Sequence, residues 1–130
     1  MITLLNRKNE HHNNIYEELL RERAAVLSRA GMAVSDAIEL LTRLDKEIEG
    51  KISFLEALKC NENIQDVEQN IQAICDEINL IIEKFNATCR KAKLQYYYLI
   101  VTREALGLRR HDRIREIYRI PDEKKKIKVI

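Results

Sequence analysis

Residues 63–107 read NIQDVEQNIQAICDEINLIIEKFNATCRKAKLQYYYLIVTREALG, and this stretch decides the fold. Counting by sevens from Ile64, seven successive positions are apolar. A second apolar stripe moves by one residue past Phe85, as in a helix relaxing from a 3.5- towards a 3.6-residue period. Gly107 is a natural helix stop, so the pattern predicts one helix over 63–106, ~65 Å long. The seven positions are Ile64, Ile71, Ile78, Phe85, Ala92, Leu99 and Leu106.

Two more helical segments are predicted upstream. Apolar residues repeat at seven through 35–60 and predict a helix there. Weaker apolar spacing predicts another helix over 13–30. Gly31 lies between the two, and it either separates them or bends a single helix. The positions that carry the pattern are Ile15, Leu19, Val26, Ala30, Val34, Leu41, Ile48 and Leu55.

Both readings of Gly31 give an all-α fold in a single domain over 1–130. A turn at Gly31 gives a three-helix bundle, whereas a continuous helix gives an antiparallel coiled-coil hairpin around residues 61–63. Each arm of a hairpin buries only one stripe, so we expect such a hairpin to dimerise into a four-helix bundle.

The composition of the 130 residues excludes several classes of protein. Three Gly and one Pro are too few for the turns of a β-sandwich or the loops of a βαβ fold. The start of the chain lacks the order of a secretory signal, and the longest apolar run is far below the ~18 residues of a membrane span. Three cysteines with no CxxC spacing fit a reducing compartment. We therefore expect a cytoplasmic protein without a membrane partner.

The C-terminal quarter is predicted to hold a short basic helix over 109–119 and a tail over 120–130. Apolar and charged residues alternate in the tail around Ile127, so one interpretation is a short strand that pairs with residues 2–5. A partly ordered tail is the reading that we favour.

The charge is segregated along the chain. Residues 1–89 carry ten basic and sixteen acidic side chains, a net charge of −6, whereas residues 90–130 carry thirteen basic and five acidic, a net charge of +8. This asymmetry indicates a polyanionic partner, a solvated face, or a dimer in which the basic end lies against the acidic stalk of its mate. The candidate polyanion-binding residues are Arg103, Arg109, Arg110, Arg113, Arg115 and Arg119.

The sequence offers little catalytic chemistry. None of the three histidines has a Glu three residues before it, as di-metal helical bundles require. Nucleophile triads, phosphate-binding loops and zinc-protease motifs are also missing from the sequence. We expect no enzyme activity, no metal and no cofactor.

An aromatic run near the end of the long helix supplies the functional hypothesis. Residues 96–101 are apolar or aromatic around most of the helix, so one neighbouring helix cannot cover them. We expect the C-terminal segment, a second subunit or a partner to pack there. We expect a non-enzymatic protein-interaction module, such as an adaptor, assembly factor or chaperone-like protein, that forms a homodimer through apolar helix faces. The alternative is a nucleic-acid-binding accessory protein that uses the basic segment. The predicted partner-binding residues are Tyr96, Tyr97, Tyr98, Leu99, Ile100 and Val101.

Overall fold

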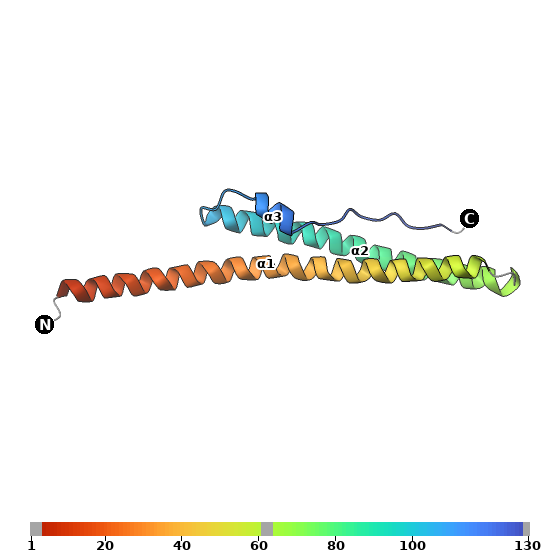
Figure 1. Cartoon of the computed structure of the whole chain (residues 1–130), viewed down its shortest axis with the longest axis horizontal. Coiled ribbons are helices and arrows are strands. Elements are labelled where there is room, and N and C mark those ends of the chain that lie inside the picture. The colour runs from red at the N-terminus through yellow and green to blue at the C-terminus, as the bar shows by residue number, and fades with distance from the viewer. Residues whose placement is uncertain (1–3, 61–63, 129–130) are drawn as a thin grey trace.

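The fold is a long helical hairpin with a C-terminal segment folded back along it (Figure 1). The computed structural model describes the backbone of residues 4–60 and 64–128 and the side chains of residues 7–60 and 68–128. Helix α1 spans Leu4–Lys59, α2 spans Ile64–Ala105 and the short α3 spans Asp112–Ile117. Helices α1 and α2 run antiparallel, which confirms the all-α hairpin. The turn expected at residues 61–63 lies outside the described residues.

Of the two alternatives left open at Gly31, the structure has the single helix, with no division between 13–30 and 35–60. Helix α1 is continuous through this position. One glycine inside a helix costs only about 1 kcal/mol, and the flanking residues are good helix formers. Gly31 is buried, and a β-carbon there would lie 3.1 Å from the hydroxyl of Tyr118. The glycine therefore allows Tyr118, from the segment after α3, to approach α1 closely.

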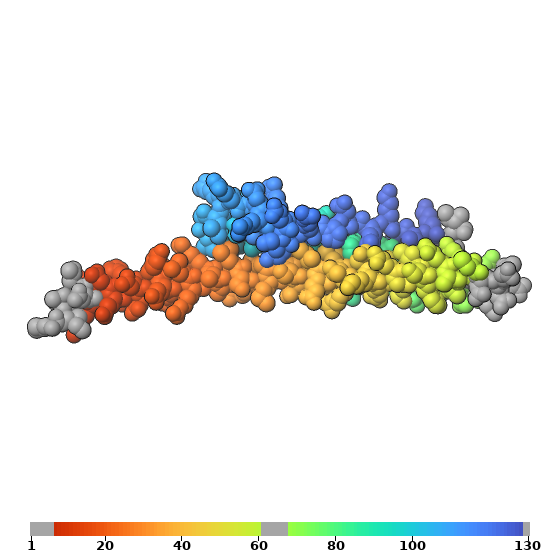
Figure 2. All heavy atoms as spheres, viewed as in Figure 1, coloured from red at the N-terminus to blue at the C-terminus, as the bar shows by residue number. Residues whose placement is uncertain are grey.

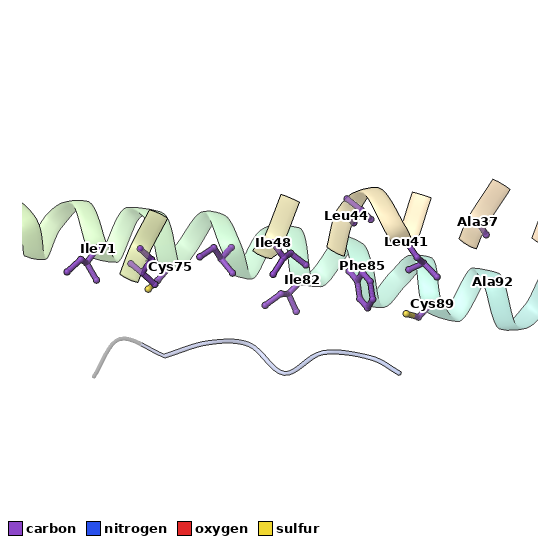
Figure 3. Close-up of a cluster of buried hydrophobic side chains, with 12 residues drawn as sticks. Ala37, Leu41, Leu44, Ile48, Ile71, Cys75, Ile82, Phe85, Cys89 and Ala92 are labelled. Atoms are coloured by element: carbon purple, nitrogen blue, oxygen red, sulfur yellow. The ribbon is translucent and has the colours of Figure 1, made fainter. Parts of the chain in front are cut away.

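The core is the seam between α1 and α2, and the sequence pattern predicted its main stripes. Ile78, Phe85 and Ala92 of α2 are at most 1% exposed. The second apolar stripe was expected to move by one residue only after Phe85. Cys75 and Ile82, which lie before Phe85, are already buried, so the displaced stripe begins earlier in α2. The reason is a third covering element, because the C-terminal tail lies along this side of α2 (Figure 3). The buried apolar side chains of α1 are Val34, Ala37, Leu41, Leu44, Ile48 and Leu55.

Helix α2 ends in a hydrogen-bonded glycine motif. The N–H of Leu108 donates to the carbonyl of Arg103 over 2.9 Å, and the N–H of Gly107 donates to that of Glu104 over 3.0 Å. Gly107 has a φ of 87°, the left-handed conformation that favours glycine. These bonds form a Schellman motif, which confirms Gly107 as the stop.

The helix predicted over 109–119 is shorter than expected. Helix α3 begins at Asp112 because the glycine motif and a side-chain bond from Arg103 Nη2 to the carbonyl of Arg110, 2.9 Å long, hold the preceding residues in a turn. The chain then runs extended along the hairpin through residues 118–128 (Figures 1 and 3). Residues 4 and 5 belong to α1, so they form no strand with this segment; residues 2, 3, 129 and 130 lie outside the described residues.

Candidate interaction surfaces

The N-terminal part of α1 projects alone beyond the end of α2 (Figure 2). We call residues 7–26 the arm, and every one of them is exposed. The arm continues the seven-residue repeat of the core, because Leu20 and Leu27 precede Val34 at the same spacing. It therefore carries an apolar face that has no counterpart on the described part of α2. The exposed apolar residues of the arm are Ile15, Tyr16, Leu19, Leu20 and Val26.

The aromatic run at the end of α2 is divided between the interior and the surface. Leu99 is only 3% exposed, so this predicted partner-binding residue is part of the interior. Tyr96 and Ile100 are half-buried and line a shallow hollow of about 240 Å³ together with His111 and Arg115. The outward-facing members are Tyr97, Tyr98 and Val101, which are 61%, 50% and 44% exposed. These three residues form the aromatic patch.

The six candidate arginines are spread over four segments of the chain. Arg103 lies on α2, half-buried, and its guanidinium contacts His111 and the carbonyl of Arg110. The Arg103 side chain therefore stabilises the turn before α3 and is not presented to a ligand. The other five are exposed, and none forms an ion pair with a described residue. They are Arg109 and Arg110 in the turn, Arg113 and Arg115 on α3, and Arg119 after it.

A small polar cluster fixes the turn that leads into α3. The Nε–H of Arg103 donates to His111 Nδ1 over 3.3 Å, so that nitrogen is an acceptor. His111 Nε2 then carries the proton and donates to Glu104 Oε1 over 3.2 Å. The cluster joins the end of α2 to the start of α3, which gives it a structural role in holding the arginine-bearing segment.

The most extensively built site is one that the sequence pattern did not predict. Two asparagines of α2, seven residues apart, each bond both backbone groups of one tail residue. Asn86 Nδ2 donates to the carbonyl of Lys124 over 2.8 Å, and its Oδ1 accepts the N–H of Lys124 over 2.7 Å. Asn79 holds Ile127 in the same way, at 3.0 and 2.8 Å. Each side-chain amide thus supplies one donor and one acceptor to a single residue.

Ion pairs add to this attachment. Lys124 Nζ lies 2.6 Å from Asp45 Oδ1 of α1 and 5.1 Å from the centre of the Phe85 ring. Lys126 Nζ lies 2.6 Å from Glu83 Oε1. The hydrogen bond and charge of Lys126 lower the pKa of the Glu83 carboxyl below its ordinary 4.5. The basic tail therefore lies on the acidic stalk of its own chain, an arrangement that we expected only between two copies.

Cys89 lies at the start of this contact, where its thiol is fully buried. Its Sγ lies 3.5 Å from the carbonyl of Pro121. Desolvation, and after it the charge of Glu123, raise the pKa of the Cys89 thiol above 9.0. The thiolate is the reactive form, so we expect Cys89 to react slowly while the tail is docked. Cys60, in contrast, is exposed.

Across residues 7–60 and 68–128, no group of three or more His, Cys, Asp or Glu side chains is placed to hold a metal ion. None of the described helices contains a segment long and apolar enough to cross a membrane.

In comparisons with known proteins, no family model, no curated protein and no solved structure matches the chain.

Proposed function

We propose that this chain is a non-enzymatic protein-interaction module that forms a homodimer through the apolar face of the arm. The observation that carries the proposal is the exposure of every residue from 7 to 26 in a helix whose apolar repeat continues the core seam. The arm continues α1, but most of the stability of a helix in a protein comes from packing of its apolar face. A second copy supplies that packing.

An antiparallel arrangement of two arms fits the geometry of the hairpin. In this arrangement the arm of a second copy lies antiparallel on the arm of the first. It covers the same face of α1 that α2 covers in the rest of the hairpin. By two-fold symmetry both arms are then covered at once. The start of each arm comes next to the end of the other copy's α2, where the aromatic patch of Tyr97, Tyr98 and Val101 is exposed. The predicted partner-binding run thus contributes its outward-facing residues to the same interface.

The mass in solution tests this proposal. We expect a species of about 31 kDa by light scattering, twice the 15.3 kDa of the chain. Leu19→Glu with Val26→Glu places two charges on the apolar face and should shift the mass to that of a monomer. Asn14→Glu with Ser28→Glu adds the same charge to the opposite face and should leave the dimer intact. A wild-type mass of one chain at micromolar concentration would contradict the proposal.

The alternative function, nucleic-acid binding, is favoured by one observation. Five exposed arginines without an ion pair to a described residue lie within residues 109–119. Clustered guanidinium groups bind phosphates without needing a sequence-specific motif. The protein should then be retained on RNA or heparin, and retention should fall steeply with salt.

The triple variant Arg109→Glu, Arg110→Glu, Arg113→Glu tests this second candidate. It removes three phosphate contacts, so the slope of log affinity against log salt should fall by about 2–3 units. Lys46→Glu with Lys59→Glu, on the stalk, is a control outside the cluster and should change the slope less. No retention of the wild type at about 50 mM salt would exclude the idea, because electrostatic binding is strong at low salt.

A further inference from the structure

The tail lies in a groove whose contacts have the character of a peptide-binding site. We define the docking groove by Asp45 of α1 and by Asn79, Phe85 and Asn86 of α2. Its occupant here is the tail, residues 120–128, which is extended and contributes Ile120 and Ile127 to the edge of the core. Four hydrogen bonds between tail and groove join the occupant's backbone to the asparagine side chains. Such bonds recognise an extended chain with little regard to its side chains, as in other modes of extended-peptide recognition.

The spacing of the two asparagines matches the repeat of an extended peptide. Seven residues of helix separate Asn79 from Asn86 and span ~10.5 Å. Three residues separate Lys124 from Ile127, and three extended residues span ~10 Å. The two lengths agree, so the side-chain amides of Asn79 and Asn86 can bind the backbone of an extended chain at the same time. We call these two amides the backbone clamps.

One side chain of the occupant is recognised specifically. Lys124 enters a position where Asp45 Oδ1 lies 2.6 Å from its ammonium group and the Phe85 ring lies 5.1 Å away. A carboxylate beside an aromatic face selects a cation. Next to it is an open hollow of about 320 Å³ lined in part by Ile38, Leu41 and Asp45. The groove therefore combines two backbone clamps, one lysine position and one aliphatic position three residues further on.

The ion pairs contribute little to the tail's hold on this site, which rests mainly on the four asparagine bonds and on Ile120 and Ile127. The paired lysines and carboxylates have side chains that are 34–58% exposed, and exposed ion pairs contribute little because water and salt screen them. Segments with few buried contacts open before the rest of a fold. Opening of the tail would expose Phe85 and Ile82, which are buried in the closed form.

We propose that the docking groove is a binding site for an extended peptide of a partner protein, with lysine followed three residues later by an aliphatic residue, and that the tail occupies it in cis. The acidic groups Asp45 and Glu83 favour a basic peptide over an acidic one. A tethered occupant acts at an effective concentration in the millimolar range. A free peptide of the same pattern can replace the tail only when its concentration exceeds this effective concentration, or when the binding of the cis tail has been weakened. This site is separate from the arm and does not rest on the dimer.

The test uses the full-length chain with the cis tail weakened by Lys124→Glu, which sets a carboxylate against Asp45. Hydrogen exchange of the tail amides in residues 124–127 and alkylation of Cys89 report the release of the tail, and both should become at least about 5-fold faster. Lys125→Glu makes the same charge change at an exposed position and should leave both rates unchanged. The probe is a fluorescent synthetic peptide of residues 119–130, followed by polarisation.

The peptide should bind the Lys124→Glu chain with a dissociation constant below about 1 mM, the scale of tethered concentrations. Adding Asn79→Ala and Asn86→Ala to that chain should weaken binding at least about 10-fold, whereas Asn70→Ala, on the exposed surface of α2, should not. A peptide with glutamate in place of the lysine should also bind at least about 10-fold more weakly.

Two results would overturn the proposal. One is absence of peptide binding to a chain whose tail has been released, since the groove would then be an internal packing site only. The other is an undisturbed tail in the Lys124→Glu chain, because the lysine position would not be the anchor that we infer. Loss of the dimer in the arm variants, with peptide binding retained, would separate this site from the proposed function.

Discussion

At the scale of single residues, the three glycines occupy three different environments. Gly31 is packed under Tyr118, Gly107 adopts a positive φ, and Gly50 has open space where a β-carbon would lie. The sequence alone identified Gly107 as a helix stop because a glycine after a long apolar repeat has that meaning. It left Gly31 undecided, since close packing against Tyr118 depends on a contact between residues far apart in the sequence.

Gly50→Ala and Gly107→Ala should change stability in opposite directions. Gly50 lies inside α1, so alanine should raise the free energy of unfolding by about 0.5–1 kcal/mol through better helix propensity. At Gly107 the left-handed conformation should make alanine destabilising by about 1 kcal/mol. Urea unfolding followed by circular dichroism measures both, and the same sign for the two changes would contradict this account.

At the scale of elements, the long helices were predictable and the tail was not. The seven-residue periodicity over 63–106 predicts which residues are buried, because the same face of the helix packs against α1 at every repeat. The tail lacks such periodicity: its half-buried residues include Ile120, Lys124 and Ile127, and its backbone bonds go to side chains of α2. The sequence feature that could have indicated this contact is the pair Asn79 and Asn86, which lie seven residues apart beside the core. Asparagine is also common on solvated helix faces, so the sign was ambiguous.

Acidification should slightly weaken the attachment of the tail, because it removes the exposed Lys126–Glu83 pair. Lys126 lowers the pKa of Glu83, so the Glu83 contribution is present above the ordinary pKa of 4.5 and is lost as the pH falls through the lowered value. Exchange of the tail amides, corrected for the intrinsic pH dependence, should therefore accelerate below about pH 4.5, whereas α1 and α2 should keep their protection. Glu83→Gln should show a weaker acid effect than wild type. Simultaneous loss of protection in the tail and both helices would argue against separate release.

At the scale of the whole molecule, the charge gradient of the sequence becomes a fold-back of one chain. The basic C-terminal part returns along the acidic stalk, where Lys124 pairs with Asp45 and Lys126 pairs with Glu83. The sequence left open a polyanionic partner, a solvated face, or contact between the basic end and the acidic stalk of a second copy. It could not distinguish contact within a chain from contact between copies, because both give the same pairing of charge types. The basic groups left without an ion pair to a described residue include the exposed arginines around α3, and the exposed apolar surface includes the arm and the aromatic patch.

The paired asparagines also make the tail a segment of fixed length. Both clamps hold backbone groups, so a substitution at Lys125, between them, changes an exposed side chain and leaves the spacing intact. Deleting or inserting one residue there shifts the second clamp by ~3.3 Å and separates Asn79 from its partner. We therefore expect the tail to tolerate substitution of Lys125 far better than a change in the number of residues between Lys124 and Ile127.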